Sequence, residues 1–114
     1  TAQQMYDSLQ RLAALPPHTK VYCTHEYSLS NLKFAKAAEP DNAEVSARLA
    51  EVTRLREEDL ISLPSSIALE QATNPFLRCN QSGVISTVTN QEESIDSADP
   101  VAVFAALRGW KDRF

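Results

Sequence analysis

Residues 20–32 read KVYCTHEYSLSNL, and they join an expected strand to an expected helix. The first part, Lys20 to Thr24, is rich in β-branched and aromatic residues and predicts a short strand. Ser28 is a residue type that caps helices, so we expect a helix to follow it at once. A strand followed by a helix is a unit of α/β folds, in which functional residues gather where strands end. The residues directly after Thr24 are therefore the first place to look for chemistry.

A helix is expected on the N-terminal side of this stretch. Thr1 and Gln4 have the spacing of a capping box, in which each side chain bonds the backbone of the other. Apolar residues then recur at Met5, Leu9 and Leu12, on one face of a helix. The prolines at positions 16–17 end that helix. The first forty residues therefore predict a helix, a strand and a second helix.

The rest of the chain predicts a different, helical organisation. Asn42 caps a helix with Val45, Leu49 and Val52 as its apolar stripe, and its many charges suggest a solvated face. A short helix starts at 63–66 and ends at Asn74-Pro75. Asp99-Pro100 starts the last helix, which runs nearly to Phe114. Residues 84–89 stay open, because Val, Ile and Thr favour a strand while the surroundings favour a helix. We expect a mainly helical α/β chain with two domains, residues 1–40 and 41–114.

Composition excludes several classes of protein. The net charge is -4, which argues against a nucleic-acid surface, and no apolar run of about 18 residues is long enough to span a membrane. The 43% hydrophobic share is that of an ordinary globular domain. Two cysteines, Cys23 and Cys79, do not make a disulfide framework, so we expect free thiols and a cytoplasmic protein.

The last helix offers a candidate anion site. Phe104, Arg108 and Lys111 follow the spacing of one helix face. A guanidinium forks onto a carboxylate and an ammonium adds a point charge, so this face suits an acidic and partly apolar small molecule. The plain alternative is that two cations near a helix C-terminus complement the helix dipole. The residues alone leave both readings open.

The end of the expected strand offers the second candidate site. Cys23 and His25 point to the same side of an extended segment. A complete metal site needs three or four ligands, and only His25, His18 and scattered carboxylates are present. His18 follows two prolines in an expected surface loop and carries little weight. His25 is therefore either one ligand of an incomplete metal site or a structural histidine.

Several motifs together resemble one family of enzymes. The run from Val21 to Ala35, with its His25-Glu26-Tyr27, resembles glyoxalase II, a family of hydroxyacylglutathione hydrolases. So do Glu39-Pro40, Leu63-Pro64-Ser65 and the run Thr73-Asn74-Pro75-Phe76-Leu77-Arg78, and so does the end of the chain from Leu107-Arg108 to Lys111-Asp112-Arg113-Phe114. These motifs occur in family order and span nearly the whole chain.

The resemblance implies a fold and an activity. Residues 1–40 would be the last helix–strand–helix part of a metallo-β-lactamase fold, and residues 41–114 an all-α, substrate-binding C-terminal domain. The enzyme would hydrolyse S-lactoylglutathione to glutathione and a 2-hydroxy acid, in methylglyoxal detoxification, by means of a metal-bound hydroxide. Two divalent ions are implied: zinc, with iron or manganese as alternatives.

The resemblance also implies roles for four residues. His25 corresponds to a metal ligand of the family and Tyr27 to a tyrosine that contacts glutathione. Arg108 and Lys111 correspond to the two cations that hold the glycine carboxylate of glutathione. This assignment agrees with the anion site that the spacing suggests.

One family motif is absent. The sequence lacks the Thr-His-x-His-x-Asp-His motif that supplies most of the metal ligands in the family. We therefore expect this chain to correspond to the C-terminal part of a glyoxalase II, monomeric and inactive by itself. The alternative is a non-catalytic helical module that binds glutathione or another protein.

Overall fold

Six α-helices make up most of the chain in a computed structural model, which describes residues 1–22, 28–62 and 64–114. They are α1 (Ala2–Ala13), α2 (Ser28–Ala38), α3 (Ala43–Glu57), α4 (Ile67–Thr73), α5 (Ser82–Gln91) and α6 (Pro100–Arg113). A 3₁₀ turn, η1 (Pro75–Leu77), follows α4, and two short strands, β1 (Lys20–Val21) and β2 (Ser65–Ser66), complete the set. The mainly helical character expected from the sequence is confirmed.

Local hydrogen bonds define where the helices begin. Thr1 and Gln4 form the expected capping box at α1. The side chain of Asn42 accepts from the backbone N–H groups of Glu44 and Val45 at α3, and Asp99 caps α6 with a proline in the first turn. These three predicted helix starts are confirmed.

Two expectations about the elements need correction, and one open alternative is decided. The strand predicted over Lys20 to Thr24 is seen at Lys20–Val21, paired with β2, and it does not include Tyr22, while Cys23 and Thr24 lie outside the described residues. Ser28 was expected to precede a helix, but it is the first residue of α2. Residues 84–89, left open between strand and helix, lie inside helix α5.

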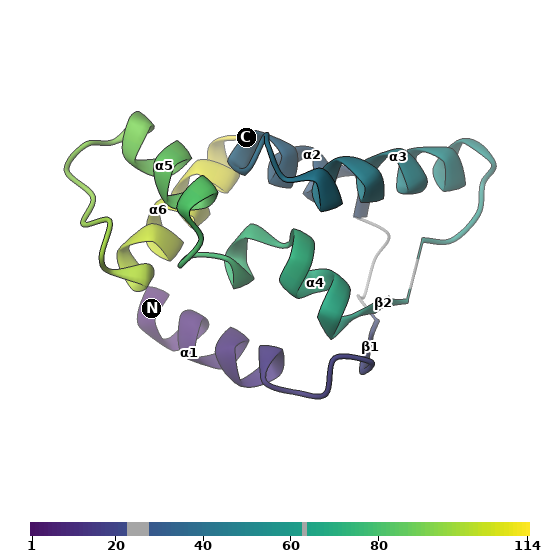
Figure 1. Cartoon of the computed structure of the whole chain (residues 1–114), viewed down its shortest axis with the longest axis horizontal. Coiled ribbons are helices and arrows are strands. Elements are labelled where there is room, and N and C mark those ends of the chain that lie inside the picture. The colour runs from purple at the N-terminus through teal and green to yellow at the C-terminus, as the bar shows by residue number, and fades with distance from the viewer. Residues whose placement is uncertain (23–27, 63) are drawn as a thin grey trace.

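The strands join two distant parts of the chain. β1 pairs antiparallel with β2, with Lys20 opposite Ser66 and Val21 opposite Ser65. The backbone N–H of Ile67 also donates to the carbonyl of Thr19 at 2.9 Å. The segment before α2 is therefore fastened to the start of α4, as Figure 1 shows where β1 and β2 meet.

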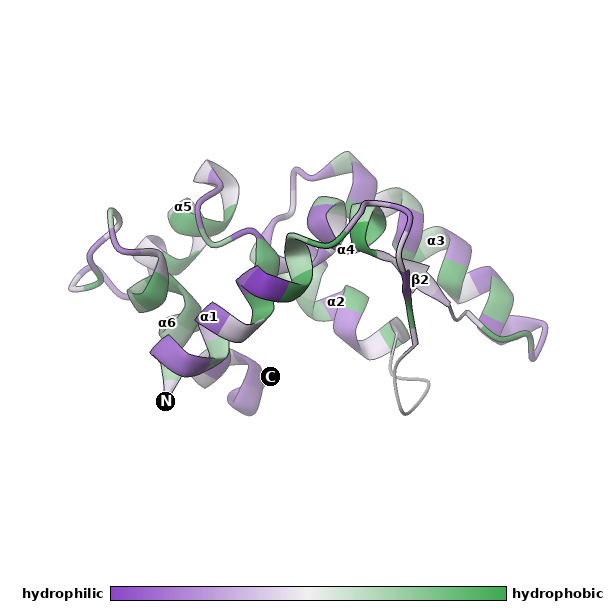
Figure 2. Cartoon of the chain, turned by 90° about the horizontal axis from the view of Figure 1, so that it is seen from below, coloured by the Kyte–Doolittle hydropathy of each residue, from purple (hydrophilic) through white to green (hydrophobic). Residues whose placement is uncertain are grey.

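The helices pack in an elongated arrangement of 43 × 27 × 23 Å. α2 packs against α3, and α1 runs along the opposite side of the molecule with α4 and η1 between (Figure 1). Along α3, hydrophobic and hydrophilic residues alternate (Figure 2). The reason is that one face of this helix buries Val45 and Val52, while another face is exposed and charged. None of the helices in the described residues combines the length and apolarity of a membrane span.

The main core lies where α2, α5 and α6 meet. Phe34, Val84, Val103, Phe104 and Leu107 are at most 1% exposed and pack in one cluster. Rings extend this cluster, since Tyr6 of α1 meets Phe104 edge-on at 6.0 Å. The N-terminal helix is thus held on the same core as the C-terminal one.

A buried ion pair fastens the end of α2 to the segment after η1. Arg78 Nε lies 2.7 Å from Glu39 Oε1, and Arg78 Nη2 lies 2.8 Å from Glu39 Oε2. Asn42 also donates to Glu39 Oε1 and to the carbonyl of Ala72. Burial raises the pKa of the Glu39 carboxyl, but the hydrogen bonds from Arg78 and Asn42 and the Arg78 charge outweigh burial and hold that pKa below its ordinary value.

Candidate functional site

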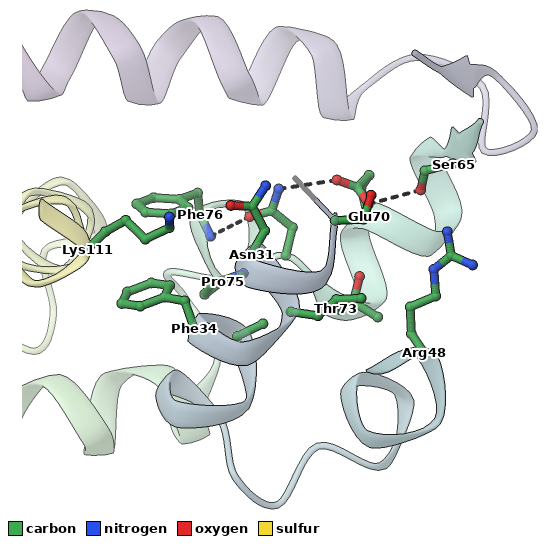
Figure 3. A pocket seen from close by; sticks show the side chains of 13 residues that line it. Asn31, Phe34, Arg48, Ser65, Glu70, Thr73, Pro75, Phe76 and Lys111 are labelled. Carbon is green, nitrogen blue, oxygen red and sulfur yellow. Dashed lines mark hydrogen bonds between the residues drawn. The ribbon is translucent and has the colours of Figure 1, made fainter. Parts of the chain in front are cut away.

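A cavity of about 160 Å³ lies between α2, α4, η1 and α6. Its floor is apolar, with Phe34 from α2 and Pro75 and Phe76 from η1. The rings of Phe34 and Phe76 are stacked with their centroids 6.0 Å apart. Lys111 from α6 stands at one side of the cavity (Figure 3), and the first turn of α2 contributes Ser28. This is the mixed apolar and polar lining that small-molecule sites have.

Lys111 lines the cavity beside an aromatic ring. Its Nζ is 5.8 Å from the centroid of the Phe34 ring, within range of a cation–π contact. In the part of the chain that the structure describes, no carboxylate lies within ion-pair distance of Lys111. Its charge is therefore available to a ligand in the cavity.

Arg108 is placed differently from Lys111. It is an exposed residue one turn earlier on α6, and it does not line the cavity. Phe104, which the spacing placed on the same face, is 1% exposed and belongs to the core. The ring beside Lys111 is Phe34 instead, because Phe104 packs against Tyr6 and Phe76.

A chain of hydrogen bonds shapes the polar wall of the cavity. Ser65 Oγ donates to Glu70 Oε2 at 2.9 Å, and Asn74 Nδ2 lies 3.4 Å from Glu70 Oε1. Asn74 Oδ1 in turn accepts from the backbone N–H of Phe76 at 2.9 Å, as the dashed lines in Figure 3 show. This chain of bonds links β2, α4 and the backbone at the start of η1.

The sequence did not single out the two charged residues of the polar side, Arg48 and Glu70. The charges of α3 were all expected on a solvated face, but the Arg48 side chain is 12% exposed and lines the cavity. Nothing local in the helix distinguishes Arg48 from Arg54. The nearby motif from Thr73 to Phe76 was the available signal, because it belongs to the same wall.

The second candidate site cannot be examined in the same way. Cys23, His25 and Tyr27 lie outside the described residues. Within residues 1–22, 28–62 and 64–114, no three His, Cys, Asp or Glu side chains form a group that would hold a metal ion. His18 is an exposed residue in a turn. The described residues therefore supply a cavity but no metal site.

Cys79 is a free, buried thiol, as expected. It is 2% exposed, and burial raises its pKa to about 12. A thiol with so high a pKa is protonated at neutral pH and is a poor nucleophile. Cys79 therefore belongs to the core.

Comparison with known proteins identifies relatives over the whole chain. Residues 26–114 match the family described as hydroxyacylglutathione hydrolase C-terminus. Proteins named hydroxyacylglutathione hydrolase are similar: one from Ectopseudomonas mendocina (strain ymp) is 65% identical over 114 residues, and one from Pseudomonas aeruginosa (strain PAO1) is 56% identical over 114 residues. One from Nitrosomonas europaea is 51% identical over 113 residues. These matches cover 99–100% of this chain but 43–44% of the relatives.

Proposed function

The chain belongs to the family of hydroxyacylglutathione hydrolase C-termini, and from this premise we propose that it supplies the substrate-binding part of a glutathione thioester hydrolase. The complete enzyme would hydrolyse S-lactoylglutathione to glutathione and a 2-hydroxy acid. The chain spans 44% of the length of its relative from Ectopseudomonas mendocina, so this activity is proposed for a longer protein that contains it.

The position of Lys111 carries the proposal. Lys111 is a cation at one side of an apolar cavity. Among the described residues it has no carboxylate partner. A glutathione thioester offers a carboxylate at its glycine end and an apolar chain at its sulfur, which suits that arrangement. Arg108, one turn away and exposed, would add a second cation for the same carboxylate.

The proposal extends to the segment just before α2. Ser28 lines the cavity and directly follows Tyr27 in the sequence, which supports a contact between Tyr27 and the glutathione moiety. We assign His25 as one metal ligand, with two divalent ions bound in the complete enzyme. When bound, such ions supply an activated water nucleophile. Because the sequence lacks the Thr-His-x-His-x-Asp-His motif of the family, the other ligands would come from the rest of the longer protein.

Steady-state kinetics on the complete enzyme test the role of the two cations. Neither cation is proposed to touch the scissile thioester, so Lys111→Ala and Arg108→Ala should raise KM about tenfold or more and largely keep kcat. Arg11→Ala, which removes an exposed cation of α1, is the control and should leave KM unchanged. If both variants lower only the melting temperature and keep KM, the cations serve the helix dipole and the proposed role is wrong.

A metal measurement tests His25 separately. A ligand sets both the position of the ion and the acidity of its bound water, so His25→Ala should lower metal content and kcat together. His18→Ala is the matched control, because His18 lies in an exposed turn and should change neither quantity. Full metal content and normal turnover in His25→Ala would leave His25 as a structural residue.

A further inference from the structure

The side of the cavity opposite Lys111 carries charges of both signs. Arg48 from α3 and Glu70 from α4 both line the cavity, on the side away from Lys111 in Figure 3. Lys111 and this Arg48–Glu70 end lie on opposite sides of the cavity in Figure 3, with the Phe34 and Phe76 rings nearer Lys111. The cavity is therefore cationic at one end and mixed in charge at the other.

The Arg48 side chain is held by two hydrogen bonds, and other N–H groups of its guanidinium have no acceptor among the described residues. Its Nη1 donates to Glu51 at 2.8 Å and its Nη2 to the carbonyl of Ser62 at 3.1 Å. These two bonds anchor the side chain, which is 12% exposed. A guanidinium has five N–H groups, so in the described residues three remain for another acceptor.

Glu70 is similarly anchored without being saturated. One oxygen accepts from Ser65 and the other from Asn74. A carboxylate has about four acceptor positions, so, counting the described residues alone, two remain for a donor in the cavity.

The two charges do not neutralise each other. Among the described residues, Arg48 forms an ion pair with Glu51, and none joins it to Glu70. Opposite charges that line one cavity and do not pair with each other suit a ligand group that carries both a carboxylate and an ammonium. A ligand carboxylate that has no ammonium beside it is matched instead by the positive charge of Lys111 at the other end of the cavity.

We propose that the Arg48–Glu70 end binds the α-amino acid group of the γ-glutamyl residue of glutathione. Arg48 would donate to its α-carboxylate, and Glu70 would accept from its ammonium. This inference rests on the proposed function, since glutathione is the ligand that has a second carboxylate and an ammonium at the end opposite its glycine. The two ends of the cavity then recognise the two ends of one tripeptide.

Two truncated ligands isolate the two contacts. Glutaryl-cysteinyl-glycine lacks only the ammonium, and 4-aminobutanoyl-cysteinyl-glycine lacks only the α-carboxylate. Calorimetric titration of the complete enzyme should show glutathione binding about tenfold or more tightly than either analogue, as the loss of a charge-assisted bond implies. Free L-glutamate should bind much more weakly than glutathione, because it lacks the glycine end.

The variants assign each contact to its residue. In Arg48→Gln the preference for glutathione over the analogue without the α-carboxylate should fall to below about twofold. In Glu70→Gln the preference over the analogue without the ammonium should fall likewise. Comparing ligands within one variant removes any general loss from misfolding. Arg54→Gln and Glu57→Gln, on the exposed side of α3, are the matched controls and should keep both preferences.

The results separate this inference from the proposed function. Preferences that persist in both variants, or a wild type that does not distinguish the three tripeptides, would overturn the inference while thioester hydrolysis stands. Free L-glutamate binding as tightly as glutathione would also overturn it, by assigning the site to free amino acids. If the wild type neither hydrolyses S-lactoylglutathione nor binds glutathione, the proposed function itself fails.

Discussion

Among single residues, Glu39 belongs to the ion pair whose side chains are the least exposed among those of the described residues. Its side chain is 10% exposed and receives a two-pronged hydrogen bond from Arg78, whose side chain is 19% exposed. The exposed pair Arg54–Glu58 forms one contact with side chains 60% and 55% exposed. Burial makes the first pair costly to break, whereas water screens the second.

The Glu39 pair should make stability depend on pH. The pKa of Glu39 is lowered in the folded state, so its contribution is fully present above about pH 4.5 and is lost as the pH falls through the folded pKa. Glu39→Gln should therefore lower the unfolding free energy by about 2–4 kcal/mol at neutral pH, and less in acid. Urea unfolding between pH 3 and 7 measures the difference.

Glu58→Gln is the matched control for this prediction. It removes a carboxylate that also faces an arginine, but an exposed one, so it should cost about 0.5 kcal/mol or less. Equal losses in the two variants, or a Glu39→Gln loss that is the same at every pH, would contradict the burial argument.

At the scale of elements, the start of α5 packs closely on the end of α2. A Cβ at Gly83 would lie 3.0 Å from Glu39 Cγ and 3.2 Å from its Oε2. Arg78 and Asn42 hold that carboxylate, so it cannot move aside freely. A glycine is therefore needed here for the close approach of two helices.

The two glycines of the chain, both in helices, should respond oppositely to alanine. Gly83→Ala should destabilise the protein, although alanine favours helices, because the methyl group meets the fixed carboxylate. Gly109→Ala should stabilise it by about 0.5–1 kcal/mol, since the nearest atom is Arg113 Nη1 at an ordinary 3.5 Å. The melting temperatures of both variants show whether each substitution stabilises or destabilises the protein. A Gly83→Ala variant as stable as Gly109→Ala would show that the Glu39 side chain moves aside for the methyl group.

At the scale of the whole molecule, the helices complete a cavity but the described residues hold no metal group. The 114-residue chain alone should therefore not hydrolyse S-lactoylglutathione, even with zinc, iron or manganese added. The complete enzyme, assayed alongside, is the control. Turnover by the pure chain above the rate of added metal alone would disprove this prediction.

Local chemistry is what the sequence encoded most reliably. The helix starts at Thr1, Asn42 and Asp99 were predictable because each rests on bonds between residues at most four apart. The end of α4 at Asn74-Pro75 was predictable for the same reason. The family motifs likewise indicated the kind of protein, now supported by a match over residues 26–114. The boundary between residues 40 and 41, the roles of His25 and Tyr27, and the metallo-β-lactamase relation stay predictions.

Residues 84–89 show how tertiary structure decides an ambiguous segment. Their Val, Ile and Thr content favours a strand, but Val84 and Val88 are one helical turn apart and both enter the core. The hydroxyls of Thr87 and Thr89 bond carbonyls four residues back, which satisfies them within the helix. Burial of the valines outweighs the local preference.

The sequence alone predicted the helices now seen as α1, α2, α3, α4 and α6, and it left residues 84–89 of α5 open between strand and helix. Only the tertiary structure decided that Lys111 and Arg48 line the cavity while Arg108 and Arg54 stay outside it. It also placed Glu70, through Ser65 and Asn74, beside that cavity. The reason is that a helix start depends on neighbours in sequence, whereas a cavity is formed by side chains that long-range packing brings together from separate elements.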